Sequence, residues 1–126
     1  MIKKIVIARP KEIEWSTSEQ YGRLQWKLLI DSTVRMTSEL SVGILKIKPN
    51  DSLSLHHHSP KEIYIIKKGK GLLLTSDQNE SLKTGDIIFI PENSLHGVQN
   101  IGKTSLLLYW IFPTDSWEEI KYNFVI

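Results

Sequence analysis

The sequence predicts an all-β, mainly antiparallel domain, folded as a sandwich, a jelly roll or a small barrel. Along most of the chain, apolar residues either alternate with polar ones or form short runs, which is the pattern of strands. Gly, Pro, Asn and Asp interrupt these runs at close intervals, as turns do. A sustained helical period of about 3.6 residues is nearly absent. Many short strands joined by close turns are typical of the three architectures named.

The first half of the chain contains five predicted strands, over residues 3–8, 23–30, 41–47, 52–58 and 61–68. The first is an apolar run that ends where Arg9 and Pro10 interrupt it. Turn signals separate the later ones, with Pro-Asn-Asp at 49–51 and Ser-Pro-Lys at 59–61.

The second half contains four further predicted strands, over residues 71–76, 86–90, 96–100 and 105–112. Gly, Asn and Asp mark the turns around them, at 68–71, 77–80, 84–86 and 100–103. These signals repeat at the short spacing expected of an antiparallel domain.

The tail of the chain carries the one helical signal. Thr114 or Asp115 is able to cap a helix over residues 116–122. Glu118 and Glu119 lie in its first turn, where a carboxylate interacts favourably with the helix dipole. We therefore expect a short C-terminal helical segment.

Composition and charge exclude several classes of protein. The chain has 126 residues, no cysteine and a net charge of +2. A chain of this length is expected to form one domain, residues 1–126, that buries about two-thirds of its extended surface without disulfides. The small charge argues against a nucleic-acid partner. The apolar start is too short for a secretory signal, and no run approaches the roughly 18 residues of a membrane span. We expect a cytoplasmic protein without a nucleic-acid or membrane partner.

Histidines and a carboxylate are spaced as metal ligands. Side chains alternate along a strand, so His56 and His58 share one face and His57 points to the other, where it is solvated or packed. If a tight turn closes a hairpin with Glu62 inward, two imidazoles and a carboxylate converge, and His96 is available as a third nitrogen. Such a set leaves one or two coordination positions open, which is a catalytic arrangement. A solvated histidine-rich loop and an exposed Glu62 are the alternatives.

This spacing resembles the two motifs of the cupins, G-x5-H-x-H-x3-E-x6-G and G-x5-P-x-G-x2-H-x3-N. The positions in register are Asn50, His56, His58, Glu62 and Gly69 in the first motif and Gly85, Pro91, Asn93, His96 and Asn100 in the second. Asn50 and Asn93 replace glycine, and asparagine is enriched among non-glycine residues at positive φ. The resemblance implies a single-domain cupin, a jelly-roll barrel with a metal inside that is bound by His56, His58, Glu62 and His96.

The residue that follows these ligands points to a reaction. Tyr64 lies two positions after Glu62 and therefore on the same face of the strand, from which its hydroxyl is able to reach a metal or a substrate. A nearby cation would lower the pKa of a phenol toward the range of a general base. Tyrosine is also a common strand residue, so packing alone is the alternative.

The Glu-x-Tyr placement in a single-domain cupin with four ligands resembles the cupin dimethylsulfoniopropionate lyases, including their short members from marine bacteria. The resemblance implies elimination of dimethylsulfoniopropionate to dimethyl sulfide and acrylate, with Tyr64 as the base. The substrate is a small zwitterion, and aromatic faces attract its sulfonium group. The aromatic residues proposed for this contact are Trp26, Trp110 and Tyr122.

Several assignments stay open at this point. The cofactor is one divalent transition-metal ion, and Fe, Ni, Mn, Co and Zn all suit such ligands. A different metal-dependent cupin enzyme, either a dioxygenase or a sugar-phosphate isomerase, is one alternative, and a non-catalytic cupin that binds small molecules is another. The apolar segment 5–7 would form a strand edge that favours pairing between two copies, so we expect a homodimer.

Overall fold

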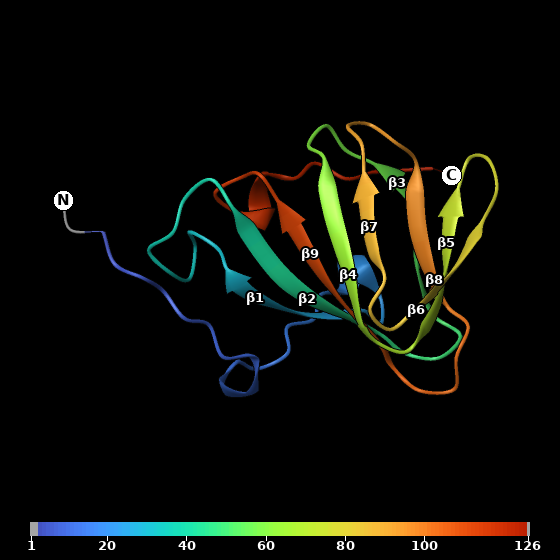
Figure 1. Ribbon diagram of the computed structural model, residues 1–126, viewed down its shortest axis with the longest axis horizontal. Helices are drawn as coiled ribbons and strands as arrows, with labels where there is room; N and C mark the ends of the chain where they lie inside the picture. Colours follow the sequence, from blue (N-terminus) through green and yellow to red (C-terminus); the bar gives the residue numbers. More distant parts are fainter. Residues whose placement is uncertain (1–2, 126) are drawn as a thin grey trace.

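Two antiparallel sheets form a jelly roll in the computed structural model, which describes residues 3–125 (Figure 1). Within these residues each sheet has five strands. The first sheet has the order β1 (Gln25–Ile30), β2 (Ser41–Ile47), β9 (Leu106–Phe112), β4 (Glu62–Lys68) and β7 (Ile87–Ile90). The second has the order β10 (Asn123–Phe124), β3 (Ser52–His57), β8 (His96–Asn100), β5 (Lys70–Thr75) and β6 (Glu80–Lys83). The predicted all-β, antiparallel fold is confirmed.

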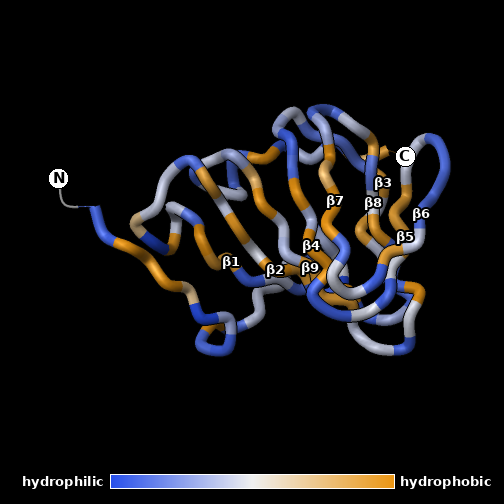
Figure 2. Tube along the Cα trace, viewed as in Figure 1, coloured by the Kyte–Doolittle hydropathy of each residue, from blue (hydrophilic) through white to orange (hydrophobic). Residues whose placement is uncertain are grey.

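Alternation along the strands builds the core. In β9 the side chains of Leu106, Leu108, Trp110 and Phe112 are buried, and the residues between them are partly exposed. Figure 2 shows hydrophobic stretches along the strands and hydrophilic ones in many of the loops. Residues of one face recur every second position, so each strand contributes one row of side chains to the interior. That interior also contains buried polar residues, among them His56, His58, Glu62 and His96.

Eight of the nine predicted strands are present, with ends shifted by at most two residues, and one prediction is wrong. Residues 3–8 contain no strand, and the side chains of Ile5 and Ile7 are 95% and 65% exposed. An alternating pattern forms a stable strand only where a neighbouring strand accepts its hydrogen bonds. Within the described residues this segment has none, and it extends away from the body (Figure 1).

Two strands, β6 and β10, were not predicted from the sequence. β6 is a short edge strand with one buried side chain, Leu82, so it lacks an apolar pattern. β10 has two residues, which pair with His56 and His57 of β3. Their pairing depends on a distant strand, and no local signal in the sequence indicates it.

The helical segment of the tail is shorter than predicted. It is a 3-10 helix, η3, of Trp117–Glu119, and Ser116 caps it instead of Thr114 or Asp115. The Ser116 hydroxyl accepts a hydrogen bond from the backbone of Glu118, and the Glu119 carboxylate accepts one from the Ser116 backbone. The chain then extends to form β10, which ends the helix. The remaining 3-10 helices are η1 (Pro10–Glu12) and η2 (Glu19–Tyr21). Within the described residues, no helix has the length and apolar character needed to cross a membrane.

The turns of both motifs cross from one sheet to the other. β3 and β4 were expected to form a hairpin, but β3 pairs with β8 and β10 while β4 pairs with β7 and β9. The turn from β7 to β8 crosses in the same way, and the backbone N–H of Asn93 donates to the carbonyl of His58, at 2.9 Å. Asn50 and Asn93 have φ values of 70° and 60°, as their place in the motifs predicts. The two crossings bring the motifs together inside the barrel.

Candidate metal centre and substrate cavity

Three imidazoles meet in the interior. Ligand nitrogens of His56, His58 and His96 all lie within 4.8 Å of one another. His56 and His96 are direct partners in the β3–β8 ladder, and His58 follows the end of β3. All three side chains are buried. A solvated histidine-rich loop is thereby excluded, and His57, between them, is only partly buried.

Each of the three rings is held by its Nδ1 atom. This nitrogen lies 2.7 to 2.9 Å from the backbone carbonyl of a residue two positions away. The pairs are His56 with Ser54, His58 with Pro60 and His96 with Ser94. A carbonyl only accepts, so Nδ1 carries the hydrogen and Nε2 of the neutral ring presents a lone pair. Histidines that bind metals are commonly oriented in this way.

The carboxylate of Glu62 faces two of these lone pairs. Its Oε1 lies 3.1 Å from Nε2 of His58 and 3.2 Å from Nε2 of His96. A neutral ring with Nδ1 protonated has no hydrogen to place between these atoms, and Nε2 of His56 is buried with no hydrogen-bond partner. Burial and the neighbouring His96 lower the pKa of His56 to about 3, so this ring stays neutral. Three ring nitrogens and a carboxylate oxygen therefore come close together with no hydrogen between them, and this arrangement fits a divalent transition-metal ion.

Tyr64 lies beside this set of candidate ligands. It is 2% exposed, and its ring centroid lies 5.8 Å from that of His96. Burial raises the pKa of Tyr64 well above its ordinary value, and the charge of Glu62 raises it further. A cation at the imidazoles would act in the opposite direction. The predicted position of the tyrosine, on the same inner face as Glu62, agrees with the structure.

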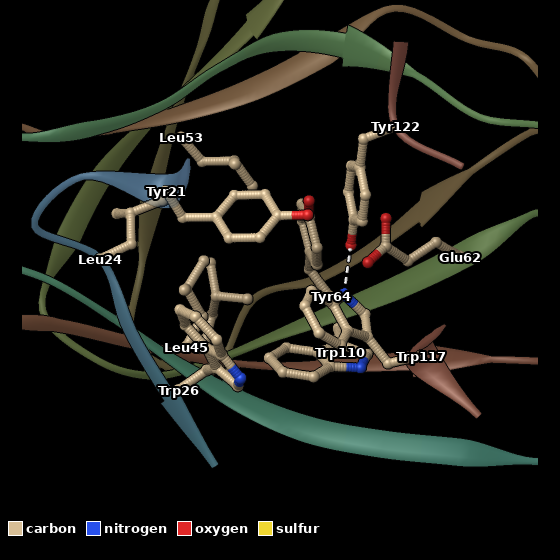
Figure 3. Close-up of a pocket in the computed structure, with 11 residues that line it drawn as sticks. Tyr21, Leu24, Trp26, Leu45, Leu53, Glu62, Tyr64, Trp110, Trp117 and Tyr122 are labelled. Carbon is tan, nitrogen blue, oxygen red and sulfur yellow. Dashed lines mark hydrogen bonds between the residues drawn. The ribbon is translucent and has the colours of Figure 1, made fainter. Parts of the chain in front are cut away.

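A mainly apolar cavity adjoins Glu62, one of the candidate ligands (Figure 3). Trp26, Trp110 and Tyr122, the three aromatic residues proposed from the sequence, all line it, together with Glu62 and Tyr64. Leucine side chains complete its wall, from Leu24, Leu45, Leu53 and Leu108. The cavity therefore joins aromatic faces to the carboxylate and phenol beside the imidazoles.

Glycine at position 43 makes room for one of these walls. Gly43 of β2, Trp110 of β9 and Tyr64 of β4 lie side by side in one row of the first sheet. A Cβ atom at Gly43 would lie 2.0 Å from a ring carbon of Trp110. The indole therefore lies across a position that tolerates no side chain, and the sequence carries no local sign of this contact.

Two aromatic residues of the cavity were not predicted from the sequence, Tyr21 and Trp117. Tyr21 belongs to η2, in a segment with no predicted element, and Trp117 belongs to the shortened tail helix. Neither is on a regular strand, so strand parity offers no signal for them. Their ring centroids lie 5.9 Å apart, and the indole nitrogen of Trp117 donates to the hydroxyl of Tyr122, at 2.8 Å.

Comparison with known proteins agrees with this architecture. The family model of the cupin domain matches residues 43–112. The chain is a cupin. This cupin is 29% identical to dimethylsulfoniopropionate lyase DddW of Ruegeria pomeroyi over 108 residues, which are 86% of this chain and 70% of the relative. It is 33% identical over 63 residues to an oxalate-binding protein of Thermotoga maritima, covering 49% of this chain and about half, 52%, of that protein.

Solved structures share the fold of this cupin. The polyketide cyclase RemF of Streptomyces resistomycificus superposes with a TM-score of 0.79 at 17% identity, covering 100% of this chain and 87% of the cyclase. A structure from work on the dimethylsulfoniopropionate lyases RdDddP and RnDddQII gives a TM-score of 0.75 at 20% identity, covering 90% of this chain and 63% of that one. At these identities the likeness concerns the fold, which serves different reactions.

Proposed function

We propose that this cupin is a metal-dependent lyase that converts dimethylsulfoniopropionate to dimethyl sulfide and acrylate. The observation that carries the proposal is a buried tyrosine, Tyr64, beside three histidines with close ring nitrogens, in a chain related to such a lyase over most of its length. The proposed ligands are His56, His58, Glu62 and His96. The ion is one divalent transition metal, for which Fe, Ni, Mn, Co and Zn are the candidates.

The reaction requires a base beside the carbon that is next to the substrate carboxylate. Removal of a proton from the carbon next to the carboxylate turns the C–H electron pair into the double bond of acrylate. The bond from the β carbon to sulfur breaks, and its electron pair leaves on neutral dimethyl sulfide, so no general acid is needed. When bound, a divalent cation supplies positive charge that offsets the charge developing beside the carboxylate. Tyr64 accepts the proton in this scheme.

The aromatic walls suit the other end of the substrate. A sulfonium cation over an aromatic face gains about 0.5 to 2 kcal/mol per ring. Trp26, Trp110 and Tyr122 line the cavity beside Glu62, and we assign all three to substrate binding, with the indole faces of Trp26 and Trp110 at the sulfonium group. Apolar walls also exclude water, which strengthens the electrostatic interactions within the cavity.

The decisive experiment is an assay under strict anaerobiosis. The metal-reconstituted protein is supplied with dimethylsulfoniopropionate, and dimethyl sulfide and acrylate are measured by gas and liquid chromatography. An elimination consumes no oxidant, so both products should form in equal amounts. Turnover that requires oxygen would instead assign the protein to the dioxygenases.

Two other functions make different predictions. A sugar-phosphate isomerase needs cationic side chains for the phosphate, and within the described residues no Lys or Arg lines the cavity. A non-catalytic cupin would bind a small acid with no turnover, and the similarity to an oxalate-binding protein is the observation that favours this reading. Saturable oxalate binding without production of dimethyl sulfide would support it.

We also propose that the protein is a homodimer. Apolar side chains on edge strand β7 are solvent-exposed, with Ile87 at 70% and Phe89 at 63%. Exposed Ile5 and Ile7 belong to the segment that extends from the body. Surfaces of this kind are typical of protein interfaces.

Light scattering should therefore give twice the mass of one chain. Phe89→Lys should shift the protein toward the mass of a single chain, whereas Ile101→Lys, at an exposed apolar residue after β8, should leave the dimer intact. A single-chain mass for the wild type would contradict the homodimer.

A further inference from the structure

We propose that Trp117 is a positioning residue that acts through Tyr122, holding its phenol oxygen so that the hydroxyl hydrogen points into the cavity toward the substrate. This inference rests on the proposed lyase function. The indole nitrogen of Trp117 lies 2.8 Å from the Tyr122 oxygen, as the dashed line in Figure 3 marks. An indole N–H only donates, so Tyr122 accepts with a lone pair and keeps its own hydrogen for another partner.

Tyr122 lies close to two of the proposed ligands, His56 and His58, where its hydroxyl hydrogen is available to the substrate. Its ring centroid lies 5.1 Å from that of His56 and 5.5 Å from that of His58. Both Tyr122 and Glu62 line the cavity, and Figure 3 shows the hydroxyl beside the Glu62 carboxylate. The carboxylate end of the substrate is expected at this side of the cavity, next to the proposed ligands. A phenol O–H directed there is a donor suited to a carboxylate.

Trp117 is itself held in place by the fold. Its backbone N–H donates to a carboxylate oxygen of Asp31, at 2.9 Å, and Asp31 is 1% exposed. The other carboxylate oxygen accepts from the backbone and hydroxyl of Thr33. Burial acts to raise the pKa of Asp31, but the hydrogen bonds, those of Thr33 first, outweigh it and lower the pKa. An ionised carboxylate from the loop after β1 therefore fixes the residue that orients Tyr122.

Packing is the competing explanation for any effect of Trp117. The indole contacts other aromatic walls, with centroid distances of 5.6 Å to Trp26 and 5.9 Å to Tyr21. Loss of these contacts would disturb the cavity whether or not Tyr122 has a hydroxyl. A role through the hydrogen bond, in contrast, must vanish when the hydroxyl is removed, and a double-mutant cycle separates the two explanations.

The test compares Trp117→Phe in the wild type and in Tyr122→Phe, with kcat/KM for dimethyl sulfide release as the first measurement. Loss of one hydrogen bond should lower kcat/KM about tenfold in the wild type. The same substitution in Tyr122→Phe should change it less than about twofold. Trp15→Phe is the matched control, because Trp15 packs under Lys27 and Lys46 and does not line the cavity, and it should leave the rate unchanged.

A second measurement needs neither metal nor turnover. In the nitrogen-proton NMR spectrum, the indole N–H of Trp117 should be protected from solvent exchange in the wild type and lose that protection in Tyr122→Phe. If Trp117→Phe does not fold, benzothienylalanine at position 117 replaces the N–H by sulfur and keeps the ring shape. This variant should show the same loss of about tenfold in kcat/KM in the wild type and less than about a twofold loss in Tyr122→Phe.

The outcomes distinguish the two proposals. A folded, metal-loaded wild type that releases no dimethyl sulfide would overturn the proposed function and, with it, this role. An active wild type in which Trp117→Phe costs the same factor in both backgrounds, or whose indole N–H is unaffected by Tyr122→Phe, would overturn the role of Trp117 alone.

Discussion

Replacing His96 with alanine should deplete the protein of its transition metal and lower the rate of dimethyl sulfide release by more than about 100-fold. Loss of a hydrogen-bond partner behind a metal ligand commonly costs about 10- to 100-fold in affinity, and loss of a ligand itself should cost more. His96 is buried against His56, with ring centroids 4.2 Å apart. Metal content is measured by elemental analysis and the rate by gas chromatography.

The chain supplies a matched control for this substitution. His57 lies between His56 and His58 but does not belong to the cluster of close nitrogens. His57→Ala also removes an imidazole. The variant should retain the metal content and the rate of the wild type within a factor of about two, the range of a surface substitution. A fully metal-loaded His96→Ala protein would remove this residue from the set of proposed ligands.

Tyr64→Phe should yield a folded, metal-loaded protein whose kcat is lower by about 10² to 10⁴, because general base catalysis contributes that much. The substitution keeps the buried ring and deletes only the oxygen that accepts the proton. Substrate affinity should stay near that of the wild type. Because the phenolate is the form that accepts the proton, the wild-type rate should increase with pH up to the pKa of Tyr64, which burial and Glu62 raise and a bound cation lowers. Steady-state kinetics across pH provide both measurements.

Tyr109→Phe is the control for the tyrosine. Tyr109 is on β9 of the same sheet, outside the cavity, with Lys67 over its ring, so deleting its hydroxyl should not alter the rate. If Tyr64→Phe keeps more than about a tenth of the wild-type rate, the base is another group and Tyr64 forms part of the wall. Tyr122 is then the next residue to test.

Local rules were sufficient to predict most of the fold and the candidate ligands. The alternation of side chains along a strand places His56 with His58 and Glu62 with Tyr64, whichever strands pair. The left-handed backbone at Asn50 and Asn93 also follows from residue type and motif position. Each of these features depends on neighbours within a few positions, so it can be predicted from a single sequence.

Tertiary structure decided which segments meet. The expected hairpin between β3 and β4 does not exist, because the turn after His58 crosses between the sheets, and residues 3–8 have no partner strand within the described chain. The sequence by itself determined the residue types, faces and spacing of the candidate ligands. The tertiary structure alone determined the hydrogen bond from the Trp117 indole to the Tyr122 hydroxyl and the packing of the Trp110 ring against Gly43. Such contacts join residues that are on different strands or in irregular segments, where no periodic pattern constrains the direction of a side chain.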